Sequence, residues 1–186
     1  MELRSLSDQN VLAKTSNAPI LFIPNPSQIN GLINKFPEVK IVVTFSETKT
    51  TKSNREVLIC DWPGEYERSD TSIIGLHMGC FVIALEGKYW LIAVDTALKS
   101  LDKDNEYLSN VAGLMVWVTD EANKSNVQEA ISHLAPTYIV YCVSADKEVL
   151  IKDLTPPPMA SVQELTIKAS ELDGESEQIK AQALIV

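Results

Sequence analysis

The sequence predicts a layered domain of helices and β-strands, and two observations lead to this class. Short runs with the apolar, β-branched content of strands alternate with segments whose apolar residues follow helical spacing. The composition is that of an ordinary globular protein, because 45% of the 186 residues are hydrophobic and 22% are charged. A chain of this length corresponds to about one domain and can bury its own core. We therefore expect residues 1–186 to form one α/β (α+β) domain.

The first third of the chain has the pattern of short strands separated by polar or turn residues. Asn25-Pro26-Ser27 favours a turn and a helix start, so a short helix is expected over Ser27–Lys35. Lys40–Thr44 is β-branched and apolar, which is typical of a strand buried on both faces. The expected strands are Glu2–Leu6, Asn10–Lys14, Pro19–Ile23, Lys40–Thr44 and Glu56–Cys60.

The middle of the chain predicts more strands and two helices. Glu86-Gly87-Lys88 is expected to form a hairpin turn. Ser125–Leu134 has apolar residues at helical spacing and Pro136 ends it, and Leu101–Asn110 is also expected to be helical. The expected strands are Thr71–Leu76, Cys80–Glu86, Tyr89–Val94, Gly113–Val118 and Tyr138–Val143.

The C-terminal part begins with a stiff spacer, Thr155–Pro158, of polyproline character. Strands are expected over Val162–Ala169 and Ala181–Val186, with a turn at Asp173-Gly174-Glu175. These residues are too few for a separate core, so residues 155–186 are expected to supply terminal strands to the same domain.

The net charge argues against two classes of partner. The net charge is −9, whereas a protein that binds the phosphate backbone of nucleic acid normally has a basic face. The same charge disfavours docking on an anionic membrane. No apolar run approaches the roughly 20 residues of a membrane-spanning helix, and the N-terminus lacks the apolar stretch of a signal peptide. We therefore expect a cytoplasmic protein.

Histidine and cysteine are scarce. The three cysteines lie far apart without metal-type spacing, so they are expected to be buried, reduced thiols. His77 and His133 are too few for a histidine-rich dinuclear zinc site. A Ser-His-Asp or Cys-His arrangement is still possible through one of them. His133 is expected on the solvent-facing side of its helix.

One segment is more specific than these patterns. Asp61-Trp62-Pro63-Gly64-Glu65-Tyr66-Glu67, followed by Ile73-Ile74-Gly75-Leu76, resembles a family of small prokaryotic zinc-dependent hydrolases of the metallo-β-lactamase fold. The resemblance covers nearly the whole chain. Residues 1–26 are similar to the opening hairpin of that family, Gly87–Asp95 has the spacing to its metal-binding aspartate, and Val127–Val143 resembles its last metal-binding segment. The resemblance to this family implies a four-layer αββα sandwich of two mixed β-sheets.

The metal ligands of the family do not carry over. Its main loop has the form H-x-H-x-D-H, in which imidazoles and a carboxylate hold zinc and lower the pKa of a bound water. The resemblance places hydroxyl side chains at these four positions: Ser46, Thr48, Thr50 and Thr51. It also places Asp8 at an early histidine, Val143 at the last histidine, and Asp95 at the metal-binding aspartate. Zinc is expected for the family, but its ligands are missing here, so no cofactor is expected.

Other side chains could in principle form a different site. Asp8, Glu65, His77 and Asp95 are the possible cleft residues, and three of them, Glu65, His77 and Asp95, could hold a single metal. Glu65 and Glu67 could serve acid–base chemistry, although their position beside Pro63-Gly64 favours a structural role for the motif. Trp62, Trp90 and Trp117 are expected in the core or at an interface.

Three functions are consistent with these residues. The first is a pseudoenzyme: a catalytically inactive metallo-β-lactamase-like protein that serves as a binding, structural or assembly module for another protein or a second copy of itself. The second is a hydrolase with a rebuilt mononuclear or metal-free site in the same cleft. The third is binding of a small ligand or nucleic acid near the basic residues Lys49, Lys52 and Arg55, which the overall acidity disfavours.

Overall fold

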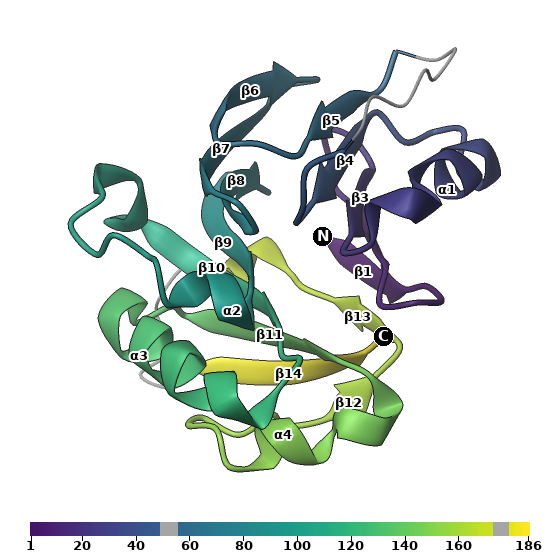
Figure 1. Cartoon of the computed structure of the whole chain (residues 1–186). Helices are drawn as coiled ribbons and strands as arrows, with labels where there is room; N and C mark the ends of the chain where they lie inside the picture. The colour runs from purple at the N-terminus through teal and green to yellow at the C-terminus, as the bar shows by residue number, and fades with distance from the viewer. Residues whose placement is uncertain (49–55, 173–178) are drawn as a thin grey trace.

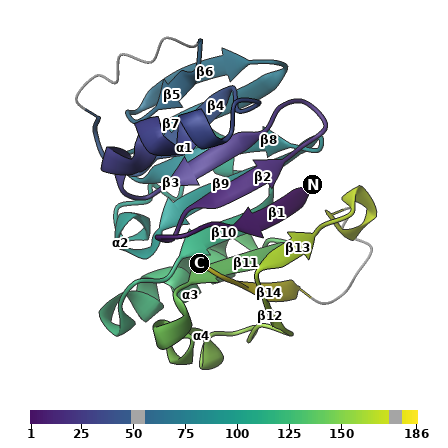
Figure 2. The same cartoon turned by 90° about the vertical axis from the view of Figure 1, so that its right-hand side faces the viewer.

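The computed structural model describes residues 1–48, 56–172 and 179–186. In these residues the strands form two mixed sheets that lie face to face, with helices on the outer side of each sheet. Figures 1 and 2 show α1 beside β3 and β4, and α3 and α4 beside β11 and β14. This is the αββα sandwich that the sequence resemblance implied.

The six-stranded sheet has the order β13-β1-β2-β3-β4-β5. Strands β13, β1, β2 and β3 are antiparallel, whereas β3, β4 and β5 are parallel. All residues of β3 and β4 are buried, as their apolar, β-branched sequences predict. The strands are β1 (Glu2–Ser5), β2 (Val11–Lys14), β3 (Ile20–Ile23), β4 (Ile41–Thr44), β5 (Leu58–Cys60) and β13 (Glu164–Thr166).

The eight-stranded sheet has the order β12-β14-β11-β10-β9-β8-β7-β6. Strands β6, β7, β8 and β9 form an antiparallel meander. Strands β9, β10, β11, β14 and β12 are parallel to their neighbours. The strands are β6 (Gly64–Arg68), β7 (Thr71–His77), β8 (Cys80–Leu85), β9 (Lys88–Val94), β10 (Val111–Trp117), β11 (Tyr138–Val143), β12 (Ser161–Val162) and β14 (Lys180–Ile185).

The helices cover the outer faces through apolar side chains. Ile29, Leu32 and Ile33 of α1 join a buried cluster with the six-stranded sheet, and Val127, Ala130 and Ile131 of α3 join one with the eight-stranded sheet. The α-helices are α1 (Ile29–Lys35), α2 (Asp95–Leu98), α3 (Lys124–Leu134) and α4 (Val149–Lys152). The 3-10 helices are η1 (Pro26–Gln28), η2 (Glu106–Leu108), η3 (Glu121–Asn123), η4 (Ala145–Lys147) and η5 (Ala169–Leu172). Within the described residues, no helix has the length and apolar character needed to span a membrane.

The inner faces of the two sheets share one apolar cluster. It includes Leu3, Val11 and Phe22 from the six-stranded sheet and Trp90 and Trp117 from the eight-stranded sheet. Trp90 and Trp117 therefore lie in the core, as expected. Trp62 lies outside the core, because 51% of its surface is exposed.

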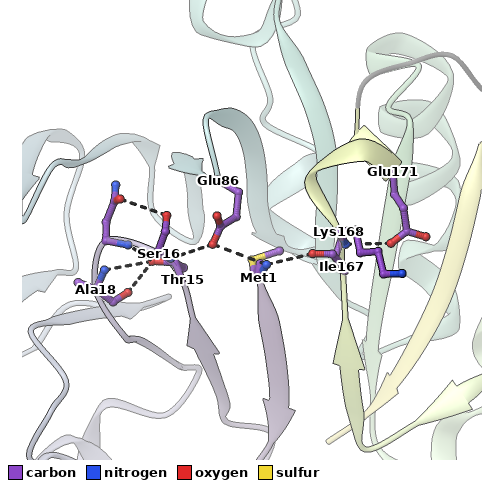
Figure 3. Close-up of polar contacts among 9 residues, drawn as sticks. Met1, Thr15, Ser16, Ala18, Glu86, Ile167, Lys168 and Glu171 are labelled. Atoms are coloured by element: carbon purple, nitrogen blue, oxygen red, sulfur yellow. Dashed lines mark hydrogen bonds and ion pairs between the residues drawn. The ribbon is translucent and has the colours of Figure 1, made fainter.

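Glu86 links the two sheets at the β8–β9 turn (Figure 3). Its Oε1 accepts a hydrogen bond of 2.8 Å from the backbone N–H of Ser16 in the β2–β3 turn. The same oxygen lies 3.6 Å from the α-amino group of Met1, which donates to the carbonyl oxygen of Ile167 at 3.0 Å. One carboxylate therefore joins turns that come from both sheets.

Two sequence predictions about elements were wrong, and one strand was missed. Leu101–Asn110 is not an α-helix: Asp104 N–H donates to the side chain of Asp102 and Tyr107 N–H to that of Asn105, which are local bonds that compete with helix formation. Val162–Ala169 is not one strand, because β12 and β13 pair in different sheets. Gly64–Arg68 forms a strand that was not expected. The turn predicted at residues 173–175 lies outside the described residues.

Candidate functional site

The ends of several parallel strands meet at one edge of the sandwich. Phe45 follows β4 of the six-stranded sheet, and Trp117 ends β10 of the eight-stranded sheet. Their ring centroids are 4.8 Å apart in an edge-to-face arrangement, so the carboxyl ends of β4 and β10 lie together. Asp95 follows β9, which is the neighbour of β10. This edge therefore holds the positions that the resemblance assigns to a metal centre, and it is the candidate site.

Aromatic side chains fill the space between the sheets at this edge. Phe22 lies 6.0 Å from Trp117, and Phe81 lies 6.5 Å from Phe45, measured between ring centroids. All four rings are buried. Trp117 also donates a hydrogen bond of 2.8 Å from Nε1 to the carbonyl oxygen of Gln9 in the β1–β2 turn. Among the described residues, aromatic side chains therefore pack between the two sheets at this edge.

Asp95 is buried, and protein donors occupy its carboxylate. Oδ1 accepts from the N–H of Thr96 at 2.7 Å and from the hydroxyl of Thr119 at 2.8 Å. Oδ2 accepts from the N–H of Thr119 at 2.6 Å and from the N–H of Asp120 at 3.1 Å. A carboxylate oxygen offers about two acceptor sites, so both oxygens are satisfied. Asp95 therefore anchors the start of α2 to the loop after β10.

The loop after β4 is held by a residue that the sequence analysis did not single out. Thr48 donates its backbone N–H to Oδ2 of Asp61 at 2.9 Å, and its hydroxyl donates to the same oxygen. Ser46 lies in this loop, whereas Thr50 and Thr51 lie outside the described residues. The available signal was the position of Asp61 at the start of the Asp61-Trp62-Pro63-Gly64 segment, which follows the hydroxyl-rich loop in the sequence.

The remaining candidates at this edge have separate environments. Asp8 is exposed in the β1–β2 turn, and Val143 is buried in the apolar cluster on the helix side of its sheet. His77 ends β7, where its Nδ1 lies 3.1 Å from the carbonyl oxygen of Met78, and its buried Nε2 has no partner among the described residues. In residues 1–48, 56–172 and 179–186, no group of three or more His, Cys, Asp or Glu side chains could hold a metal ion.

Glu65 lies elsewhere, on β6 at the end of the eight-stranded sheet. Its Oε1 accepts a hydrogen bond of 3.1 Å from the hydroxyl of Tyr107, and this bond raises the pKa of Tyr107 above its ordinary value. Glu65 and Glu67 line a cavity of about 480 Å³ together with Tyr89 and Tyr107. Glu65 thus belongs to an outer surface and not to a group with Asp95 and His77.

The Pro-Gly-Glu-Tyr-Glu motif shapes a tight hairpin. A Cβ atom at Gly75 would lie 2.5 Å from the carbonyl oxygen of Trp62, so only glycine fits there. Gly64 pairs with Gly75, and the hydroxyl of Tyr66 donates to the Trp62 carbonyl at 2.9 Å. These contacts favour the structural interpretation of the motif.

The thiols and the second histidine have environments close to those expected. Cys60, Cys80 and Cys142 are free and buried. Burial, with the charge of Asp61 as a smaller contribution for Cys60, raises the pKa of Cys60 to about 12, and burial alone raises that of Cys80 to about 12. Such thiols are poor nucleophiles and poor metal ligands at neutral pH. His133 is exposed on α3, with Nε2 3.0 Å from the carbonyl oxygen of Lys103.

Comparisons with known proteins place this geometry in a known fold. No protein-family model and no curated protein sequence matches the chain. A crystal structure of a proposed Zn-dependent hydrolase of the metallo-β-lactamase superfamily from Thermotoga maritima superposes with a TM-score of 0.66, at 13% identity and over 100% of both chains. A metallo hydrolase from the hyperthermophilic archaeon Ignicoccus hospitalis gives a TM-score of 0.52 at 9% identity, over 100% of this chain and 94% of the other. This chain has the metallo-β-lactamase fold.

The side chains at the candidate site do not fit the zinc that the names of such hydrolases imply. Neutral hydroxyls are poor zinc ligands, Val143 offers no donor atom, and the oxygens of Asp95 already accept four hydrogen bonds. A zinc site also needs about three protein ligands, and the described residues bring no such group together.

Proposed function

We propose that this chain uses the metallo-β-lactamase fold without metal-dependent chemistry, as a protein-binding or assembly module. The observation that carries the proposal is the environment of Asp95. Asp95, which the resemblance assigns to a metal-binding aspartate, is buried, and both of its oxygens accept hydrogen bonds from the protein, three of them from backbone N–H groups. A carboxylate in this state stabilises two loops and has no acceptor site left for a metal.

Packing at the same edge supports the proposal. Phe45 and Trp117 pack against each other at the edge that follows β4 and β10, and Trp117 is also hydrogen-bonded to Gln9. Introducing polar metal ligands between these rings would disrupt a well-packed core, which is energetically costly.

A protein is the partner that the chemistry favours. The net charge of −9 disfavours nucleic acid, because affinity for a phosphate backbone comes mainly from basic side chains. A second copy of the chain is the other partner to test, by measuring the mass in solution over a range of concentrations.

Metal content tests the proposal directly. Elemental analysis of the purified protein is expected to give far less than one zinc or iron per chain, and calorimetric titration with Zn²⁺ or Mn²⁺ is expected to give no saturable heat. One tightly bound metal per chain that is lost in His77→Ala would contradict the proposal. It would favour the alternative, a hydrolase with a rebuilt mononuclear site that uses His77.

Hydrolysis assays are the second test, because they would also detect a catalytic site that works without metal. Phosphodiester, lactone and ester substrates are expected to show no hydrolysis above that of His77→Ala measured in parallel. A rate that depends on His77 would overturn the proposal even in the absence of metal.

A further inference from the structure

The first observation is that β6 ends the eight-stranded sheet. Among the described residues it pairs only with β7, so one edge of its backbone faces away from the sheet. Figure 1 shows β6 at the end of the sheet remote from α3 and α4. An edge strand of this kind can accept a further strand from another chain.

The second observation is a hollow on the outer face beside β6. Two cavities of about 480 Å³ and about 320 Å³ adjoin there and share Tyr89 and Tyr107. The larger reaches from β6 to β9 and is lined by Glu65, Tyr66, Glu67, Ser72, Ile74, Tyr89 and Tyr107. Tyr89 is 44% exposed, so its ring is accessible on this surface. We call this surface the tyrosine groove.

The third observation is the charge of the groove. Among the described residues, its two cavities are lined by Glu65, Glu67 and Glu106 and by no lysine or arginine. Aromatic faces and carboxylates are the groups that bind ammonium and guanidinium ions, through cation–π contacts and charge-assisted hydrogen bonds. The groove is thus complementary to lysine or arginine side chains.

The alternation of side chains along β6 predicts the sequence pattern of a peptide segment that could bind beside it. Glu65 and Glu67 line the groove, whereas Tyr66 between them also packs against the apolar core between the sheets. A strand added beside β6 would place every second side chain next to Glu65 and Glu67, and opposite charges in such cross-strand pairs are stabilising. The side chain between them would lie on the side of Tyr66.

We propose that an extended basic segment of a partner protein adds to β6 as a further strand, with alternate lysine or arginine side chains in the tyrosine groove. The recognised pattern is basic–apolar–basic. This proposal rests on the protein-binding role proposed above, for which it names the surface and the chemistry of the partner. The acidity of the whole chain favours the encounter with such a segment.

Peptide binding tests the charge recognition. The probe is a fluorescein-labelled seven-residue peptide that alternates Lys and Val, followed by fluorescence anisotropy at low salt. Glu65→Gln with Glu67→Gln is expected to weaken binding at least tenfold. The control, Glu38→Gln with Glu121→Gln, makes the same change in net charge at exposed positions away from β6 and is expected to change affinity less than twofold. Equal losses in the two double variants, or no binding to the unaltered protein, would overturn the proposal.

Amide hydrogen exchange tests the strand addition. The peptide is expected to slow exchange of the β6 amides that face the free edge at least fivefold, and to leave the α1 amides unchanged. Binding without any slowing in β6 would overturn strand pairing. If the protein is free of metal but does not bind the peptide, the proposal for the tyrosine groove is wrong and the proposed function is unaffected. If the purified protein holds one zinc per chain, the proposed function alone is contradicted.

Discussion

Asp95 has an environment that favours a structural role over the metal-binding role implied by the sequence resemblance. It directly follows β9, the strand that the sequence analysis expected over Tyr89–Val94. Its role depends on Thr119 and Asp120, which lie 24 and 25 positions further along the chain and donate to its carboxylate. No local pattern in the sequence reports those contacts, so the sequence could not distinguish a metal ligand from a structural anchor.

Removing this carboxylate is expected to destabilise the fold. Asp95→Ala leaves the N–H groups of Thr96, Thr119 and Asp120, whose hydrogen bonds are partly buried, without their acceptor. We expect a loss of about 3 kcal/mol in the free energy of unfolding, since each buried donor left unsatisfied costs about 1–3 kcal/mol and the loops can relax in part. Urea unfolding followed by circular dichroism measures it. Asp104→Ala, at an exposed position, should stay within about 0.5 kcal/mol, and an equally small effect for Asp95→Ala would refute the anchoring role.

At the scale of elements, the β6–β7 hairpin depends on one close backbone approach. Gly75→Ala would place a Cβ atom 2.5 Å from the Trp62 carbonyl oxygen and 3.1 Å from Cα of Pro63. Both neighbours are backbone and cannot rotate away, so we expect a loss of about 2 kcal/mol or more, in the range of overpacked sites.

Gly31→Ala in α1 is the matched control, because no atom lies within 4 Å of its added Cβ. It should gain about 0.5–1 kcal/mol from helix propensity. Thermal unfolding compares the two, and equal shifts would show that the hairpin tolerates a side chain.

The elements themselves were largely predictable, and the exceptions have physical causes. Buried strands such as β3, β4 and β11 are continuous apolar runs, and α3 has a clear helical period, so local sequence determines them. Strand β6 was missed because four of its five residues are polar or glycine, and its pairing with β7 makes it a strand. The packing around Trp117 at the candidate site was also not predictable, because Trp117 and its hydrogen-bond partner Gln9 are 108 positions apart.

At the scale of the whole molecule, the contact between Phe45 and Trp117 joins the two sheets. A double-mutant cycle with Phe45→Leu and Trp117→Phe is expected to show a coupling energy of about 0.5–1.5 kcal/mol, which is typical of edge-to-face aromatic pairs. The free energies of unfolding of the four proteins in urea supply the cycle. Additive effects would mean that the rings fill space independently and that the closure of this edge does not rest on their contact.

Glu86 links the two sheets through its charged carboxylate, so the contribution of this link to stability depends on pH. Burial favours the neutral form of its carboxyl, but the hydrogen bond from Ser16 and the Met1 ammonium group outweigh this, so the pKa of Glu86 lies below its ordinary value. A carboxyl whose pKa is lower in the folded state stabilises the protein above its unfolded pKa, which is about 4.3, and this contribution is lost as the pH falls through the folded value.

Glu86→Gln is therefore expected to cost about 1 kcal/mol at neutral pH and progressively less in acid, because the wild-type carboxyl is then neutral as well. Urea unfolding of both proteins between about pH 7 and pH 3 measures the difference, with Glu2→Gln, which alters an exposed pair with Lys14, as the control that should change little at any pH. A cost for Glu86→Gln that is constant with pH would mean that Glu86 joins the sheets by the shape of its side chain and not by its charge.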